Sequence, residues 1–352
     1  MTTQTRERLE SHIIGSLMAA ALGDAMGAAT EQHSIPEVIA NYGGLLRDLQ
    51  APSTETFSHG NQPGEVTDDS SQMFALAQAL IDTHGKLTEQ IWIQTLIHWS
   101  QTSKHKNQMG PTTRPLLQAL AAGEDTSSIG RTPFSTRKLT SFGATNGAAM
   151  RIAPVGLIHP GDIEAAVRLA WTTSRPTHDT QVAAASAGAI AAGVAHALLP
   201  DADVLSVMQA CLQGARLGEE LGAREGRRVP GPSIARRIEI AVEEALRSRS
   251  LYDAIVAIEA AIGNSVMAAE SIPAAVGIFV AAAGQPLDTV SAGASIGNDS
   301  DTIAAMAGAL AGALRGYDAI PAQLVAQVKA ANPEDIEALG RGLTEISWRN
   351  MQ

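Results

Sequence analysis

The feature that most constrains the fold is that apolar residues recur three and four positions apart along almost the whole chain. That spacing places apolar side chains on one face of an α-helix. β-branched runs in which apolar and polar residues alternate strictly, as they do in strands, are absent from the sequence. The sequence therefore predicts an all-α fold. The clearest helical runs are Met73–Ile81, Thr88–Ser100, Thr113–Ala122, Ile163–Trp171, Asp203–Leu217, Ile234–Leu246 and Pro321–Ala331.

Turn-forming residues separate these runs at Gly110-Pro111, Pro160-Gly161, Pro230-Gly231-Pro232 and Asn332-Pro333. The chain has 352 residues, a length that would accommodate two domains. However, no long linker, shift of composition or repeat of fixed period divides it. We therefore expect a single domain over residues 1–352.

The amino-acid composition excludes several classes of site and of binding partner. Aromatic residues make up only 3% of the chain, so the core must be built mainly from Ala, Leu, Ile, Val and Met. A single cysteine, Cys211, excludes a disulfide scaffold and any Cys-based zinc or iron–sulfur site. Because Cys211 lies in the apolar run Val204–Leu217, we expect an inert core thiol, with a reactive thiol as the alternative. A net charge of −11 argues against sequence-independent binding to nucleic acid.

Val182–Leu199 is nearly uncharged and close to the length of a membrane-spanning helix. It is dominated by weakly apolar Ala, Gly and Ser, and it contains His196. We therefore expect a buried helix that packs closely through small residues. The N-terminal stretch Met1–Arg8 is polar and has no apolar signal segment behind it, so we expect a cytoplasmic protein without a membrane partner.

Two acidic segments, Gly64–Ser70 and Gly297–Thr302, each lead into a very apolar helix. Helix capping is the simplest explanation, because Thr, Asp and Ser accept hydrogen bonds from unpaired backbone N–H groups. Capping needs only one side chain, whereas each segment presents two carboxylates and a hydroxyl. Burying that many anions is costly unless cations compensate. Oxygen donors without Cys suit Mg²⁺, Mn²⁺ or Ca²⁺, and these segments offer enough ligands for two ions.

A third segment, Gly15–Glu31, is an apolar helical stretch interrupted by Asp24. Asp24 either caps a neighbouring loop or supports a metal ligand from behind. Glu31, at the polar end, is free to reach a metal ion or a water molecule beside the substrate.

Three further segments carry polar groups with open roles. Asn146-Gly147 favours a turn with positive φ and exposed N–H groups, and a plain turn is the alternative. His178 opens the Ala-rich helix either as a capping or core histidine or as part of a site. The segment Arg224–Arg237 is either a solvated turn or a grip on a phosphate-bearing partner.

Taken in order, these motifs resemble the ADP-ribosylglycohydrolase family over about residues 10–316. The resemblance rests on Gly23-Asp24-x-x-Gly27-x-x-x-Glu31, Thr67-Asp68-Asp69-Ser70, Asn146-Gly147-Ala148-Ala149-Met150-Arg151-x-Ala153-Pro154, Thr177-His178, Glu270-Ser271-Ile272-Pro273-Ala274-Ala275 and Gly297-Asn298-Asp299-Ser300-Asp301-Thr302-Ile303-Ala304-Ala305-Met306-Ala307-Gly308-Ala309. It implies a compact orthogonal multi-helix bundle with a cleft that holds two Mg²⁺ or Mn²⁺ ions. Residues 317–350 would add C-terminal helices to this core.

The resemblance also implies roles for individual residues. Asp301 would bridge the two ions, and Met150 and Arg151 would support the Asn146 loop. Glu31 is the first candidate for the general acid/base, and an unshared carboxylate of Asp68 or Asp299 is the second. The implied metal ligands are Thr67, Asp68, Asp69, Asp299, Asp301 and Thr302, and the implied substrate-binding residues are Asn146, Gly147 and His178.

The expected activity is metal-dependent hydrolysis of the C1 glycosidic bond of an ADP-ribosyl group, carried by a protein or a small molecule. Two ions would chelate the ribose diol and polarise a water molecule, and cleavage would pass through an oxocarbenium-like state. The alternatives are a hydrolase of smaller ribosides such as nucleosides, or a non-catalytic ADP-ribose-binding member. The chain departs from the family pattern in three places, one of which is the stretch Arg175–Thr180 around His178, where many relatives carry a further His-Pro. Phe142–Thr145 contains no carboxylate for a leaving arginine, and Asn298 replaces a common glycine.

Overall fold

The computed structural model describes residues 3–352, and residues 1 and 2 of the expected domain lie outside the described part. Within it the chain forms α-helices, short 3₁₀ turns and loops, and no β-strand. Its only extended pairing consists of three isolated bridges, Arg131↔Lys138, Thr145↔Met267 and Thr180↔Arg227. The all-α prediction is confirmed.

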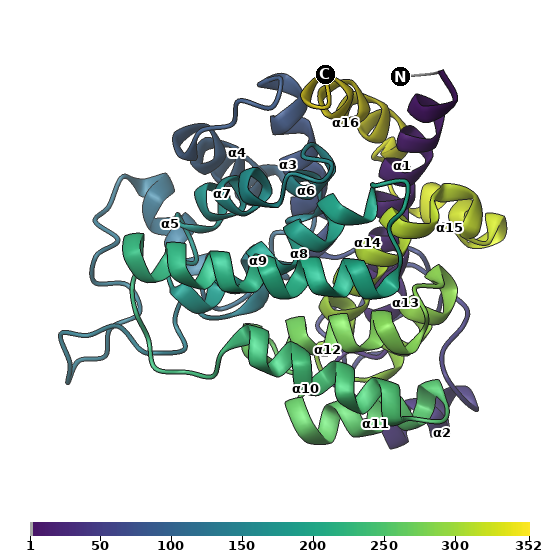
Figure 1. Cartoon of the computed structure of the whole chain (residues 1–352). Helices are drawn as coiled ribbons and strands as arrows, with labels where there is room; N and C mark the ends of the chain where they lie inside the picture. The colour runs from purple at the N-terminus through teal and green to yellow at the C-terminus, as the bar shows by residue number, and fades with distance from the viewer. Residues whose placement is uncertain (1–2) are drawn as a thin grey trace.

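The helices follow one another in the order shown in Figure 1. They are α1 (Thr3–Gly27), α2 (Ile35–Tyr42), α3 (Asp68–Asp82), α4 (Glu89–Thr102), α5 (Thr113–Ala122), η1 (Asn146–Ala148), α6 (Ala153–Leu157), α7 (Ile163–Ser174), α8 (Gln181–Ala197), α9 (Val204–Glu225), α10 (Ile234–Arg247), α11 (Leu251–Ile262), α12 (Ala268–Ala281), α13 (Pro286–Ser295), α14 (Ser300–Arg315), η2 (Tyr317–Ala319), α15 (Ala322–Ala331) and α16 (Ile336–Asn350).

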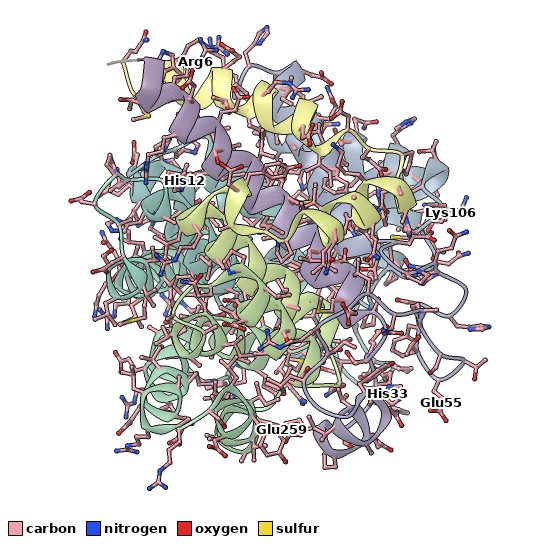
Figure 2. The ribbon with its side chains drawn as sticks, turned by 90° about the vertical axis from the view of Figure 1, so that its right-hand side faces the viewer. Arg6, His12, His33, Glu55, Lys106 and Glu259 are labelled. Atoms are coloured by element: carbon pink, nitrogen blue, oxygen red, sulfur yellow. The ribbon has the colours of Figure 1, made fainter. Side chains whose placement is uncertain are left out.

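Helices α1 and α14 cross at backbone contact through small residues. A Cβ atom placed on Gly23 would lie 2.3 Å from the carbonyl oxygen of Ala304, and one placed on Gly27 would lie 2.4 Å from Cα of Asp301. Further along the pair, Gly312 lies equally close to Gly15. Gly23 and Gly27 are four residues apart in α1, so both lie on the same face of that helix, where no side chain keeps the two backbones apart. In Figure 2, α1 runs diagonally across the molecule beside the yellow C-terminal helices.

Helix α8 is the predicted small-residue core helix. It is buried along almost its whole length, and Gly188 packs against Gly214 of α9. Within the described chain no helix is long and apolar enough to cross a membrane. The prediction of a buried helix over this segment is confirmed.

Helix α9 is longer than predicted, because it continues from Leu217 to Glu225. The added turns are polar and lack an apolar stripe, but they hold two glycines on the face toward α8. Gly218 packs against the backbone of Ala184, and Gly222 packs against Gln181. Close backbone contact therefore extends the helix where apolar periodicity is missing.

Helix α12 contains Pro273 in its interior. Because proline has no N–H group, the carbonyl of Ala269 loses its helical hydrogen-bond partner. Arg237 of α10 replaces it, donating from Nη1 to the Ala269 oxygen at 2.8 Å and to the Ile262 oxygen at 3.2 Å. Arg237 therefore satisfies backbone groups of α11 and α12 and does not lie in a solvated turn.

One connected apolar core runs from Leu9 in α1 to Ile346 in α16. Cys211 lies fully inside it, and burial raises the pKa of its thiol to about 12, so the inert core thiol is the interpretation that fits. Because α16 contributes to the same core as α1, these contacts support a single domain that includes the C-terminal helices.

We expect Gly23→Ala to destabilise the protein by about 1–3 kcal/mol, because the added methyl group would force α1 and α14 apart. Chemical denaturation monitored by circular dichroism measures the loss. Gly110→Ala is the control, since a Cβ atom there meets nothing within 4 Å and should change stability by less than about 0.5 kcal/mol. Equal stability of the two variants would contradict the backbone contact.

Candidate functional site

The N-terminus of α3 is capped without the carboxylates of Asp68 and Asp69. The hydroxyl of Thr67 accepts the backbone N–H of Asp69 at 3.2 Å. Asp24 reaches across from α1 and accepts the backbone N–H groups of Thr67 at 3.0 Å and of Ser70 at 2.9 Å. Asp24 is therefore a buried capping residue, one of the two roles expected for it. Capping does not explain why Asp68 and Asp69 are acidic.

The N-terminus of α14 has a similar surplus of carboxylates. Asp299 stands at the N-cap position but makes no side-chain capping bond. Instead it accepts from Asn146 Nδ2 at 2.5 Å and from Thr302 Oγ1 at 3.4 Å. The preceding Asn298 has φ +53°, which asparagine tolerates better than most residues, so the left-handed backbone survives the replacement of glycine.

The structure brings most of the predicted site together at one end of the α1–α14 pair. Asp69 Oδ2 and Asp301 Oδ1 are buried and have no hydrogen-bond partner, and neither has Ser70 Oγ. Within residues 3–352 no three His, Cys, Asp or Glu side chains are placed so that they could hold a metal ion as they stand. The buried carboxylates are Asp24, Glu31, Asp68, Asp69, Asp299 and Asp301.

Mutual repulsion and burial shift the titration of this cluster. Burial, together with the charges of Asp299 and Asp68, raises the pKa of Glu31 to about 8. Burial and the charge of Asp24 raise the pKa of Asp68 to about 7, and burial raises that of Asp299 to about 6. The pKa values of Asp69 and Asp301 also lie well above the ordinary range, for the same reason. The nearby charge of Arg151 lowers the pKa of Asp68 but does not offset burial and repulsion.

Arg151 is the buried cation of this region. Its guanidinium faces the charges of Asp68 and Asp69 and lies 5.3 Å from the centre of the Trp92 ring. Nη1 donates to Gln72 Oε1 at 2.6 Å, and Gln72 Nε2 donates to Asp68 Oδ2 at 2.8 Å. Sequence reasoning gave Arg151 only a supporting role and missed Gln72. The four-residue spacing of Gln72 from Asp68 on one helix was the available signal.

Glu31 lies beneath the loop of residues 53–66. Ser58 donates to Glu31 Oε2 at 3.4 Å, and Glu31 itself is only 7% exposed. His33 Nε2 lies 3.5 Å from Glu55 Oε2, a contact that ties the loop to the chain that follows α1; both residues are labelled in Figure 2. Glu31 thus approaches the carboxylate cluster from the loop side, and its contact with a metal ion or a water molecule stays a prediction.

The Asn146 turn differs from the predicted one. It is a 3₁₀ turn in which Gly147 does not have positive φ, and the Asn146 N–H is bonded to the Val266 oxygen at 3.0 Å. The prediction of positive φ at Asn146-Gly147 is wrong, and so is that of an exposed N–H group at Asn146. Glycine is needed there because a Cβ atom would lie 2.9 Å from Cε1 of His178. Close packing, not turn geometry, selects the glycine.

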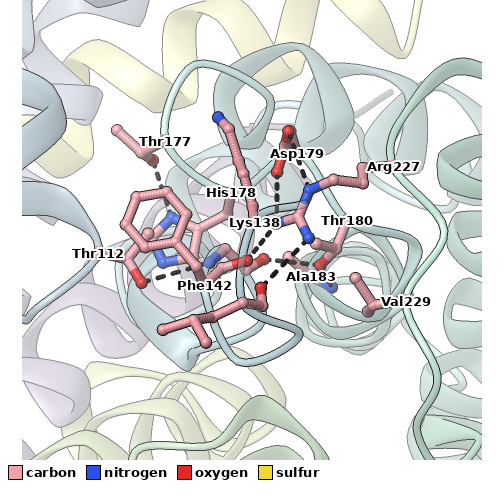
Figure 3. Close-up of polar contacts among 12 residues, drawn as sticks. Thr112, Lys138, Phe142, Thr177, His178, Asp179, Thr180, Ala183, Arg227 and Val229 are labelled. Atoms are coloured by element: carbon pink, nitrogen blue, oxygen red, sulfur yellow. Dashed lines mark hydrogen bonds and ion pairs between the residues drawn. The ribbon is translucent and has the colours of Figure 1, made fainter. Parts of the chain in front are cut away.

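His178 lies behind that turn and is fully buried. Its Nδ1 is 2.8 Å from Thr177 Oγ1 (Figure 3), and its Nε2 is 2.9 Å from Thr145 Oγ1. Burial and the charge of Arg151 lower the pKa of His178 to about 3, so the ring is neutral. The structure therefore places Asn146 at the carboxylate cluster and His178 one layer behind it.

Arg227 clamps the chain that leads into the Asn146 turn (Figure 3). It donates to the carbonyl oxygens of Phe142 and Leu139 and pairs with Asp179 at 3.2 Å. The Thr180 hydroxyl donates to the Gly143 oxygen at 2.6 Å, which closes the same junction. Arg227 is thus held by other segments of the chain and is not part of a solvated turn.

A cavity of about 1010 Å³ lies between α3, α4 and the start of α16. Its walls include Phe74, Trp99 and Leu339, and none of the predicted site residues lines it. The metal-binding cleft implied by the resemblance is therefore not this cavity and stays a prediction.

Comparison with known proteins identifies the class. The sequence model of the ADP-ribosylglycohydrolase family matches residues 5–350. The chain belongs to this family, and it is accordingly a hydrolase of glycosidic bonds.

Individual relatives cover nearly the whole chain. It is 30% identical over 339 residues to an uncharacterised protein, YegU, of Escherichia coli (strain K12), covering 95% of this chain and 96% of that one. It is 25% identical over 336 residues to the ADP-ribosylhydrolase ARH3 of Homo sapiens, covering 88% and 87% of the two chains. A solved structure described as an ADP-ribosylglycohydrolase-related protein complex has the same fold, with a TM-score of 0.69 and 22% identity over 97% of this chain and 99% of that chain.

We expect Arg227→Ala to speed backbone amide exchange about tenfold in residues 139–143, because the clamped carbonyls lose their charged donor. Hydrogen–deuterium exchange with mass spectrometry resolves this loop. Arg228→Ala is the matched control, since Arg228 is exposed and donates only to the Ala223 oxygen. If both variants exchange like the parent protein, the clamp does not order the loop.

Proposed function

We propose that this protein is a divalent-metal-dependent hydrolase that cleaves the C1 glycosidic bond of ADP-ribosyl groups. One observation carries the proposal. Two helix N-termini bring together buried carboxylates that capping does not need, and Asp69 Oδ2 and Asp301 Oδ1 have no partner at all. A buried carboxylate oxygen without a partner is too costly to persist without compensation.

The donor set fits a hard cation. The candidate ligands are all oxygens, from Thr67, Asp68, Asp69, Asp299, Asp301 and Thr302, and such sets favour Mg²⁺ or Mn²⁺. A pair of ions bound by them would supply Lewis acidity toward the ribose diol and a water molecule. The family is generally metal-dependent, which supports this part of the proposal.

Asn146 and Glu31 have different roles in this proposal. Asn146 Nδ2 donates to Asp299 Oδ2 at 2.5 Å, and this hydrogen bond keeps Oδ2 facing the Asn146 turn. Glu31, on the loop side, is placed to move a proton at the leaving group or the attacking water. The oxocarbenium-like character of glycoside cleavage benefits from the surrounding negative charge.

The substrate is proposed to be an ADP-ribosylated protein or a small ADP-ribosyl conjugate. Relatives described as ADP-ribosylhydrolase ARH3 support this substrate class. We also propose that the protein acts in the cytoplasm as a single domain and without nucleic acid.

Metal-dependent release of ADP-ribose from ADP-ribosyl-arginine or another ADP-ribosyl conjugate is the expected result when the protein is assayed with Mg²⁺, with Mn²⁺ and after chelation. Asp68→Ala and Asp301→Ala should each abolish release while helical content, measured by circular dichroism, stays near normal. Asp253→Ala, which removes an exposed first-turn acid from α11, is the control and should keep activity.

Turnover that survives both site substitutions would remove the metal mechanism. Cleavage of nucleosides, with ADP-ribosyl conjugates ignored, would replace the proposed substrate by smaller ribosides. Tight binding of ADP-ribose without turnover of any conjugate would identify a binding protein instead.

We expect Glu31→Gln to lower kcat by about 10²–10⁴-fold, the usual contribution of a general acid or base, with little change in ADP-ribose affinity. Steady-state kinetics and calorimetry measure the two effects separately. Glu37→Gln is the control, because glutamine also suits the capping box at the start of α2. An unchanged rate for Glu31→Gln would reject the acid/base role.

A further inference from the structure

A continuous buried line of side-chain hydrogen bonds connects Asp68 of the carboxylate cluster to the Asn146 turn. Arg151 lies at its middle, with Gln72 and Asp68 on one side and Thr177 on the other. From Thr177 the line continues to His178, a contact drawn in Figure 3, and then to Thr145 and Thr112. Every one of these residues is buried.

The line has two arms, which both begin at Arg151 and lead to Asp68 and to the Asn146 turn. Arg151 fixes the direction of the hydrogen bonds in the arm toward Asp68. A guanidinium group only donates hydrogen bonds, so Gln72 Oε1, 2.6 Å from Nη1, must be the acceptor. The amide group of Gln72 cannot then be reversed, and its NH₂ end faces Asp68 Oδ2 at 2.8 Å. Oδ2 of Asp68 therefore receives a donor, which leaves Oδ1 as the oxygen free for another partner.

The same argument fixes the arm toward the turn. Thr177 Oγ1 accepts from Arg151 Nη2 at 2.9 Å, so its own proton goes to His178 Nδ1 at 2.8 Å. The competing acceptor, the Ser174 carbonyl, is farther away at 3.5 Å. A neutral ring that accepts at Nδ1 carries its proton at Nε2, from which it donates to Thr145 Oγ1 at 2.9 Å.

The surroundings of Arg151 keep it charged, so the donor and acceptor roles along the line stay as described. The guanidinium is held over the Trp92 ring, the residue is 1% exposed, and its charge persists because its pKa stays near 10. The Thr145 hydroxyl donates to Thr112 Oγ1 at 3.3 Å. Both arms therefore start at Arg151, which can only donate hydrogen bonds. Its donor role sets the donor and acceptor of each following hydrogen bond.

We propose that Arg151 is a positioning residue that sets the hydrogen-bond direction on both sides of the site: it presents the Gln72 amide to Asp68, and through Thr177 it holds His178 as the Nε2–H tautomer behind the Asn146 turn. His178 then acts through Thr145 and does not touch the substrate. The amide orientation follows from the hydrogen-bond geometry, and the tautomer follows from that geometry together with the full burial of His178, which keeps the ring neutral. Only their effect on catalysis rests on the proposed function.

The direct test is the tautomer of His178 in the full-length protein. Long-range ¹H–¹⁵N correlation spectra of protein labelled at its nine histidines separate the two neutral tautomers. The His178 signal is assigned by its loss in His178→Asn, and it should show the Nε2–H form. An Nδ1–H form, or a charged ring at neutral pH, would overturn the proposal whether or not the protein is a hydrolase.

Thr177→Val tests the arm without removing the buried charge. It should release Nδ1 of His178, change the tautomer signal and lower kcat about tenfold while KM stays within about twofold, since a loosened turn costs alignment more than binding. Thr177→Ser should restore both readouts, because serine keeps the hydroxyl.

Thr173→Val is the matched control. It also removes a buried hydroxyl, but that hydroxyl is bonded only to carbonyls of its own helix, of Leu169 and Ala170. If Thr177→Val and Thr173→Val give the same spectrum and the same kcat, Arg151 sets no direction through Thr177. If no variant or parent shows turnover, the proposed function fails, and the spectra alone decide the present proposal.

Discussion

The close contact between α1 and α14 is the constraint on which the site depends. Because no side chain separates the helices at Gly27, the start of α14 lies directly against the end of α1. The acids at that start therefore meet Asp24, which lies one turn earlier in α1, and Glu31, which follows it in the chain. Asp24 in turn holds the first backbone amides of α3. One helix crossing thus brings both acidic helix N-termini to the same place.

This arrangement sets stability against function. The carboxylates are buried in a core of small aliphatic residues, where the charged form is penalised, and Arg151 is the buried cation facing them. Thr67 and Asp24 do the capping of α3, so Asp68 and Asp69 add repulsion without being needed as caps. A fold that tolerates such groups must gain its stability elsewhere, and the continuous core from α1 to α16 is where it does so.

Sequence reasoning predicted the helices well where apolar periodicity alone defines them, and it missed what depends on packing between segments. Helix α9 continues past Leu217 because glycines touch α8, a contact that no local pattern reveals. The acidic segments were recognisable because each has more carboxylates than helix capping requires. The conformation at Gly147 was predicted wrongly, since Asn-Gly signals a positive-φ turn, whereas the glycine is required here by the close approach of the His178 ring. The partnership of Gln72 with Arg151 joins α3 to the chain before α6, so neither residue alone suggested it.

The indole rings beside α3 give the protein a built-in optical reporter. Trp92 stacks on the Arg151 guanidinium, and Trp99 donates from Nε1 to Ser71 Oγ at 2.7 Å, three residues after Asp68. Aromatic residues are scarce in this chain, with four tryptophans in all, so the emission of these two is not lost among many others. A change of charge or order at the start of α3 alters the field around both rings. Intrinsic fluorescence can therefore follow events at the carboxylate cluster without an attached dye.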